Sequence, residues 1–583
     1  MPCEKIVETT IRDGEDLGFG SDSSDIEEAP SDYSEEFCTW EVFGDTDILE
    51  ATAAVAEAPR TARNDWVPFT SQEDFMACLM SGYLRKMLSR VTYLLLRLIL
   101  AMKNLILPHW DSVRRTKERI RRMLGLTTIE TLSVWDNRLF TISLKVILAN
   151  ELLNPQVTRH LEYCPHDPTG TQIGSLYQCF KWREDLSREL RVQMAYIGSK
   201  HYFIFEPTHL KSGEVVIPTY FFKANGSLYA KCCTPQYKDS ESGKGFKIVI
   251  PGRGIKFSDH SLTTVDIKEF DEMYSELYLD DTCGGRLFEL VNGDKVEVAL
   301  PNPWRQKANG KIICHVLITL YSDNTSGNSS KQWNKHISFY FTLAGLHPHL
   351  TNQEYHCHFL GTSNVAGVLE LAEPIVEEMN DLATDGHFAY DSHLKQDVLI
   401  MSVIMADSPM HAEITSTPPP RKRQQPMSGM SVVCSKEGGQ IPERICNIFH
   451  RIIRWHASVT YPPPPRLRNW EETKSRLHQA WRDSKNKAKT SYNEDLRKYG
   501  MKDNINVEFV EKYHQRNKPG QREAINKLEK DNFDRLFSPF LRLKGFDGAK
   551  DTPVEILHVF QLGIIRYLLQ DFMSGLTDGN KRT

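Results

Sequence analysis

The stretch that most limits the fold of this chain is a nearly uninterrupted apolar run, VLIMSVIMA, at residues 398–406. A run of this length fits a strand and is short for a helix, and a strand without polar alternation is typical of a sheet that is covered on both faces. The residues before it predict three further strands and one helix, at 312–321, 337–343, 355–360 and 367–384. Pro374 is expected to kink the helix. This unit predicts a mixed α+β domain.

Two carboxylates end two of these strands: Asp323 follows the first strand and Asp407 follows the last. The order strand, strand, strand, helix, strand is that of the ribonuclease H-like fold, in which the first and fourth strands lie side by side. The two carboxylates would then converge on one site and suit a pair of Mg²⁺ or Mn²⁺ ions that catalyse phosphodiester cleavage or strand transfer. A plain structural role stays open for both, because Asp323 opens a polar turn and Asp407 precedes a Ser-Pro pair typical of helix starts.

The charge of the chain is unevenly distributed. The formal net charge is −5, but residues 1–50 carry sixteen acidic side chains against two basic ones. So acidic a segment cannot bury enough apolar surface to fold, and residues 1–64 are therefore expected to form a disordered tail. The tail either keeps the protein soluble or competes with nucleic acid for the mildly basic remainder of the chain.

Residues 65–135 predict helices of two kinds. The apolar stretch 91–107 is interrupted by Arg97 and Lys103, which indicates an amphipathic helix that docks on the protein or a partner. A membrane-surface helix and a membrane span are the alternatives, although a membrane partner is not expected. The next helix suits phosphate binding or a nuclear address, or is simply a solvated face. Its basic residues are Arg114, Arg115, Lys117, Arg119, Arg121 and Arg122.

Composition divides the rest of the chain into four parts. Residues 136–300 contain short β-branched and aromatic runs and predict a β-rich region with hairpins, and residues 301–415 form the first part of the ribonuclease H-like core. Residues 416–440 are a Pro-rich linker, and residues 441–583 predict a helical insertion rich in Lys and Arg. Within the linker, Arg421, Lys422 and Arg423 suit either a nuclear address or an exposed loop.

Histidines and cysteines leave the metal chemistry of the chain open. His347, His349, His356, Cys357 and His358 fall within twelve residues, and His356 and His358 would share one face of a strand. Zinc or copper could use such a cluster, but histidines at a sheet edge are the alternative, so no zinc site is assigned. The twelve cysteines include no C-x-x-C pair, which predicts reduced thiols in an intracellular compartment, the nucleus or otherwise the cytoplasm.

Five sequence strings resemble a large family of transposase-derived proteins of mushroom-forming fungi, related to the Plavaka and CACTA-type transposons. The strings are PNPWRQKANGK (301–311), LYSDNTSGNSSKQWNKH (320–336), HCHFLGTSNVAGVLELAEPIVEEMN (356–380), ADSPMHAEI (406–414) and LRLKGFDGAKDTPVEILHVFQLG (541–563). The resemblance covers about residues 140–583. It implies a ribonuclease H-like core with an acidic triad and a long insertion before the third acid. By position, Asp323 matches the first acid and Asp407 the second, and the family's motif before the third acid falls on Glu555 and His558.

The chain departs from the family pattern at several points. Relatives have Asp-Asp where this chain has Asp323-Asn324, and they carry zinc-type cysteines and an N-terminal zinc finger that this sequence lacks. No third acid is assigned, Asp571 and Asp578 being the candidates, and Glu555 also fits a helix capping box. The resemblance thus implies a DNA-binding, self-associating transposase relative that is incomplete as an enzyme and has no small-molecule substrate. The alternative is a non-catalytic nuclear DNA-binding or protein-interaction module that retains only the fold.

Overall fold

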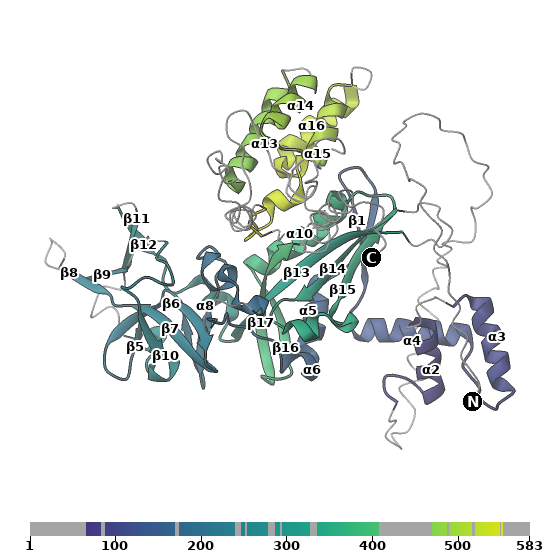
Figure 1. Cartoon of the computed structure of the whole chain (residues 1–583), viewed down its shortest axis with the longest axis horizontal. Helices are drawn as coiled ribbons and strands as arrows, with labels where there is room; N and C mark the ends of the chain where they lie inside the picture. Colours follow the sequence, from purple (N-terminus) through teal and green to yellow (C-terminus); the bar gives the residue numbers. More distant parts are fainter. Residues whose placement is uncertain are drawn as a thin grey trace, which may run out of the picture. The chain divides into compact units, whose positions relative to one another are not determined.

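The computed structural model describes twelve stretches of the chain, residues 66–82, 88–168, 174–239, 246–250, 254–277, 286–291, 294–326, 335–406, 469–486, 489–515, 519–548 and 550–551. The chain divides into two compact units, Met1–Pro108 and His109–Thr583, each of which is considered by itself (Figure 1). The predicted acidic tail and the Pro-rich linker lie outside the described residues.

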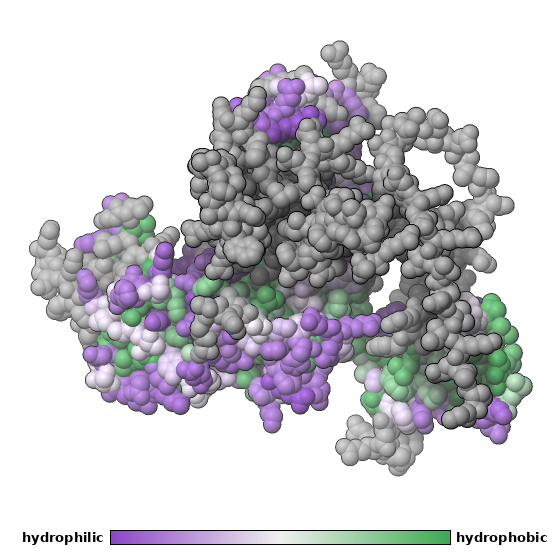
Figure 2. All heavy atoms as spheres, viewed as in Figure 1, coloured by the Kyte–Doolittle hydropathy of each residue, from purple (hydrophilic) through white to green (hydrophobic). Residues whose placement is uncertain are grey.

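The first unit contains the helices α2 (Gln72–Gly82) and α3 (Arg90–Ala101). On α3, the Arg97 Nε donates to the carbonyl of Leu107 over 2.8 Å, so the polar side of this helix is turned toward its own chain. On its apolar side, Val91, Leu95, Leu98 and Ile99 are 68%, 56%, 64% and 54% exposed. Docking of this helix on the protein or a partner stays a prediction. Figure 2 shows hydrophobic residues gathered over this helix. No helix within the described ranges is long and apolar enough to cross a membrane.

The second unit is built around a seven-stranded sheet with the order β1-β2-β15-β14-β13-β17-β16. The strands are β1 (Thr128–Leu132), β2 (Arg138–Ile142), β13 (Ile312–Ser326), β14 (Lys335–Leu343), β15 (His358–Ser363), β16 (His387–Asp391) and β17 (Gln396–Ala406). The central strand β13 is antiparallel to β14 and parallel to β17, with Leu320 opposite Ala406. The predicted side-by-side placement of the first and fourth strands is therefore confirmed.

Two strands of this sheet differ from the prediction. The third strand begins only at His358, because residues Glu354–His356 form a 3₁₀ turn. The strand β16 was not predicted at all; it is a short edge strand that alternates between half-buried and exposed residues, and it forms a hairpin with β17. In addition, β1 lies in a segment that was expected to be helical.

Both faces of the sheet are covered, as the apolar run 398–406 predicts. On one face, Cys314, Val316 and Ile318 belong to a core shared with α5 (Leu144–Leu153) and α10 (Val368–Thr384). On the other face, Ile313 and Leu317 contact a second core that includes Trp182 of the helical turn η2 (Lys181–Asp185) and Trp304 of α8 (Pro303–Ala308). Each fully buried aliphatic side chain contributes about 1.5–3 kcal/mol to folding. The helix α10 matches its predicted range closely and contains Pro374.

Of the β-rich region predicted at 136–300, the described residues from 194 onward are mainly strands, whereas residues 144–158 form the helices α5 and α6 (Pro155–Thr158). A hairpin of β3 (Met194–Ile197) and β4 (Lys200–Phe203) precedes two four-stranded sheets, ordered β10-β7-β6-β5 and β12-β11-β9-β8. The remaining strands are β5 (Thr208–His209), β6 (Val215–Ala224), β7 (Ser227–Cys233), β8 (Gln236–Asp239), β9 (Phe246–Ile250), β10 (Thr263–Asp266), β11 (Leu287–Val291) and β12 (Asp294–Val298). Asn225 and Gly226 join β6 to β7 with φ angles of 49° and 77°, the backbone that an Asn-Gly hairpin turn requires.

The C-terminal part is helical in its described residues, as predicted. It contains α13 (Trp470–Ser484), α14 (Lys489–Lys498), α15 (Asn504–Tyr513) and α16 (Pro519–Asp531). Leu477 and Trp481 of α13 belong to the same hydrophobic core as α10. Two arginines beyond α16 also bind α10, since Arg535 Nε and Arg542 Nη2 lie 2.7 and 2.9 Å from the carboxylate of Glu373.

Candidate functional site

The first candidate acid, Asp323, lies on the central strand. The sequence places it in a turn after the first strand, but β13 continues to Ser326 and Asp323 pairs with Ser338 of β14. The turn was a wrong expectation, because residues 335–338 supply backbone partners that hold this polar segment in the sheet. The Asp323 side chain is exposed. The neighbouring strand β17 ends at Ala406, opposite Leu320, so Asp323 lies three residues beyond that pair on β13.

The other residues predicted at this site lie outside the described part of the chain. They are Asp407, which follows Ala406 directly, Glu555, His558, and the third-acid candidates Asp571 and Asp578. Residues Arg421, Lys422 and Arg423 of the linker are also outside it. The structure therefore brings two strand ends together and describes one of the two carboxylates expected there.

A buried ion pair near the end of β17 was missed by sequence reasoning. The Lys181 Nζ lies 2.6 Å from the Asp551 carboxylate and donates over 2.7 Å to the carbonyl of Ile404, two residues before the end of β17. Both charged side chains are only 9% exposed. Burial raises the pKa of Asp551, and the charge of Lys181 opposes that shift. The pair fixes residue 551, four positions before Glu555, beside the last residues of this strand.

The basic residues predicted at 114–122 lie on one helix. They all lie on α4 (Trp110–Met123), at the start of the second unit. Five are exposed and Lys117 is half-buried; Arg122 approaches Glu118 to 3.8 Å. The exposed ones are Arg114, Arg115, Arg119, Arg121 and Arg122. Such a face can contact phosphates in water.

The histidine cluster is not arranged as predicted. His356 ends a 3₁₀ turn and β15 begins at His358, so the two do not share a strand face. The Nε2 of His358 lies 4.0 Å from a carboxylate oxygen of Glu151. Burial lowers the pKa of His358 to about 4 and raises the pKa of Glu151 to about 7. Among the residues that the structure describes, no group of three or more His, Cys, Asp or Glu side chains could hold a metal ion.

Two adjoining cavities lie where the β-rich region meets the turn after η2. Their volumes are about 590 and 500 Å³. Both are lined by residues that sequence reasoning did not select, among them Arg188, Phe205 and Glu289. The sequence does not indicate this site, because its residues come from distant parts of the chain. Arg188 and Glu289, for example, form a 2.7 Å ion pair although they are 101 positions apart.

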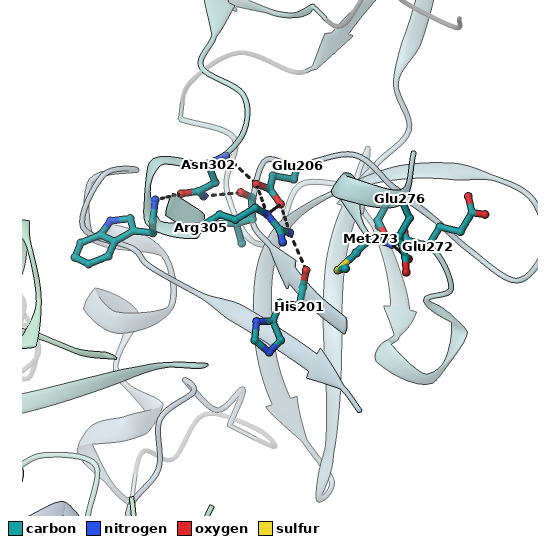
Figure 3. Close-up of polar contacts among 10 residues, drawn as sticks. His201, Glu206, Glu272, Met273, Glu276, Asn302 and Arg305 are labelled. Atoms are coloured by element: carbon teal, nitrogen blue, oxygen red, sulfur yellow. Dashed lines mark hydrogen bonds and ion pairs between the residues drawn. The ribbon is translucent and has the colours of Figure 1, made fainter. Parts of the chain in front are cut away.

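A second buried ion pair holds the wall of these cavities (Figure 3). The Glu206 carboxylate is 2% exposed and binds the guanidinium of Arg305, with Nε at 3.0 Å and Nη2 at 2.6 Å. Glu206 also accepts from the backbone N–H of Asn302 over 2.8 Å, and Arg305 donates to the carbonyl of His201 over 2.7 Å. Burial raises the pKa of Glu206, and Arg305 opposes that shift. These bonds join β4 to α8 and fix Phe205, the residue before Glu206.

Part of the β-rich region matches a known protein family. Residues 194–314 match a family described as a domain of unknown function (DUF8591). The matched range runs from the first residue of β3 to the third residue of β13, and so contains most of the β-rich region. No match was found among curated proteins.

Proposed function

We propose that this chain is a transposase-related protein with a ribonuclease H-like core. It is an incomplete copy of the enzyme, in which Asp323 and Asp407 would hold Mg²⁺ or Mn²⁺ for a residual cleavage of a DNA phosphodiester. The observation that carries the proposal is the strand order around β13. This strand lies between the antiparallel β14 and the parallel β17, with β15 beyond β14, and α10 follows β15 in the sequence. This is the order expected for that fold.

The register of the two central strands supports a shared site for the acids. Asp407 is bonded to Ala406, so its Cα lies about 3.8 Å from that of Ala406. Ala406 pairs with Leu320, and Asp323 lies three residues further along the same strand. With a rise of about 3.3 Å per residue, this separation is within the reach of two carboxylates that bind a pair of metal ions.

The chemistry of the donors also fits. Exposed carboxylate oxygens are the ligands that Mg²⁺ and Mn²⁺ take in proteins. When bound, such ions activate the attacking oxygen of water or a 3′ hydroxyl and stabilise the leaving oxygen of the phosphodiester. The role of the chain's own side chains is to hold the ions at the end of the central strands, and the Lys181–Asp551 pair fixes the chain before Glu555 and His558 beside that end.

DNA is the proposed partner, and α4 is the proposed contact. Its exposed arginines offer a charge-based contact to the phosphate backbone, which is independent of DNA sequence and weakens as salt is added. The proposal includes a nuclear location, for which α4 and the linker residues 421–423 are the candidate addresses, and self-association. Neither a small-molecule substrate nor a membrane partner is part of it.

Nicking of supercoiled plasmid tests the proposal. We expect nicking with Mn²⁺ and little or none with Mg²⁺, because Mg²⁺ demands a near-ideal octahedral ligand set and only two acids of the triad are assigned. The changes Asp323→Ala and Asp407→Ala should each abolish nicking. Asp397→Ala is the matched control, since Asp397 is the second residue of β17, at the other end of the same strand, and is exposed beside Lys311. All variants must match the wild type by circular dichroism.

A second candidate function is DNA binding without cleavage, and the exposed basic face of α4 favours it. It predicts salt-sensitive DNA affinity in a folded wild type that does not nick in either metal. The change of Arg114 and Arg115 to Ala would weaken that affinity and reduce its salt dependence by about two phosphate contacts.

A further inference from the structure

Arg188 and Arg191 line the smaller cavity, and Arg183 is close to them in the sequence. Two of these three arginines have carboxylate partners. Arg183 pairs with Asp167 and Glu184, and Arg188 pairs with Glu289 over 2.7 Å. The carboxylate of Glu184 is further engaged by the backbone N–H of Phe257 over 3.1 Å. Buried charges in proteins are normally paired in this way, because an unpaired one loses its hydration without compensation.

Arg191 is the exception. It lines the same cavity and is 6% exposed. In the described part of the chain no carboxylate lies within ion-pair distance of it, although the charge of Glu184 favours its charged form. Its Nε has no hydrogen-bond partner, and its Nη1 donates to the backbone carbonyl of Glu184 over 3.4 Å. The guanidinium also has a side-chain hydrogen bond with Tyr220. Burial lowers the pKa of this guanidinium from its ordinary value. An anion in the cavity would supply an acceptor for the Nε.

Aromatic rings hold the arginines of the cavity in place. The Arg191 guanidinium lies 4.1 Å from the ring centre of Tyr220, and the Arg188 guanidinium lies 3.7 Å from that of Phe205. Phe205 lines the cavity with a φ of 63°, a conformation that a bulky side chain rarely adopts. Backbone strain of this kind is concentrated at ligand sites. The donors are therefore fixed in advance of any ligand.

We propose that this cavity of about 500 Å³ binds the phosphate group of a phosphomonoester, with Arg191 as its buried contact and Lys256 as its contact at the rim. The forked guanidinium is suited to two oxygens of one phosphate. Four carboxylates also line the cavity. Glu184 and Glu289 are paired with Arg183 and Arg188, whereas Asp185 and Glu189 are exposed, so the cavity suits one phosphate group rather than a polyanion. The proposal stands without the proposed nuclease function, because the cavity does not include Asp323.

Calorimetry with the full chain tests the proposal, with inorganic phosphate as the first probe and chloride as the control anion. We expect phosphate to bind the wild type and the change Arg191→Met to raise Kd by about tenfold or more, since it removes charge-assisted hydrogen bonds. Arg138→Met is the matched control, because Arg138 is exposed on β2 and pairs with Glu130 at the surface. Equal Kd values in Arg191→Met and the wild type, or no phosphate binding by a folded wild type, would overturn the proposal.

Two further arms complete the test. If circular dichroism shows that Arg191→Met does not fold, Lys256→Met is used instead, because Lys256 is exposed and its removal leaves the core intact. A Kd for phosphate that is unchanged in Lys256→Met overturns the proposal. Adenosine 5′-monophosphate and a 5′-phosphorylated oligonucleotide then distinguish a nucleotide from a DNA end as the source of the phosphate. An unphosphorylated oligonucleotide that competes as well as the phosphorylated one would contradict phosphate recognition.

Discussion

Arg305→Met should be among the most destabilising single changes in the β-rich region. The substitution keeps an unbranched side chain but leaves the Glu206 carboxylate, 2% exposed, without its guanidinium partner. Of the hydrogen bonds to Glu206 in Figure 3, only that from the backbone N–H of Asn302 would remain. Removing one partner of a buried ion pair typically costs about 3–5 kcal/mol, and we expect a loss of that size in the free energy of unfolding.

The pH dependence of this loss follows from the direction of the Glu206 pKa. Burial already raises that pKa in the folded protein, and the loss of Arg305 removes the charge that opposes the shift. When the pKa of a carboxyl group is higher in the folded than in the unfolded protein, the group stabilises the fold at a pH below its pKa in the unfolded protein. This contribution is lost as the pH rises through its pKa in the folded protein. The deficit of Arg305→Met relative to the wild type should therefore shrink as the pH is lowered toward 4.

Urea unfolding followed by tryptophan fluorescence measures the effect. The control is Glu276→Gln, which breaks the 3.0 Å ion pair between Glu276 and Lys200. The side chains of Lys200 and Glu276 are 34% and 35% exposed. A surface pair of this kind contributes about 0–1 kcal/mol. The double change Glu206→Gln with Arg305→Met should recover part of the loss, because no buried charge is then left unpaired. The reasoning is refuted if Arg305→Met costs no more than Glu276→Gln.

Three further changes test other parts of the account. Lys181→Met should cost about 3–5 kcal/mol in urea unfolding, because it leaves Asp551 buried and unpaired; a loss below about 1 kcal/mol would contradict the burial of this pair. In the wild type, the raised pKa of Glu151 should make the free energy of unfolding fall as the pH rises from about 4.5 to 7, and Glu151→Gln should remove this fall. If the free energy of unfolding of Glu151→Gln falls with pH as much as that of the wild type, this reasoning is refuted. Gly386→Ala should destabilise the protein by more than about 1 kcal/mol, because Gly386 has a φ of 73° and an added Cβ would lie 2.8 Å from the carbonyl of Ile400. Gly198→Ala is its control, with a φ of 60° and nothing within 4 Å, and an equal loss in thermal unfolding would show that the close approach has no cost.

The strands that sequence reasoning found are those whose signal is local. The run 398–406 identifies β17 because it is buried on both faces, and the apolar residues of 312–321 and 337–343 identify β13 and β14 for the same reason. The edge strand β16 was missed because only one of its five residues is fully buried. The polar end of β13 was missed because Asp323 to Ser326 are held by pairing with β14 rather than by their own strand propensity.

The site residues, like the strands, were predicted where their signal is local and missed where it depends on distant parts of the chain. Asp323 was selected because it follows an apolar run, which is a local feature, and its placement on β13 required only a shift of the strand end. The ion pair of Glu206 with Arg305 joins residues 99 positions apart, and that of Lys181 with Asp551 joins residues 370 apart. Charged residues occur throughout such a chain, so nothing in the sequence indicates which of them become buried together.

The central claim is that Asp323 and Asp407 share one metal site at the ends of β13 and β17, and Mn²⁺-dependent nicking of supercoiled plasmid tests it most directly. The account predicts nicking by the wild type and by Asp397→Ala, and none by Asp323→Ala or Asp407→Ala, with all four proteins equally folded. Nicking that persists in either of the last two variants, or a folded wild type that never nicks, would contradict it.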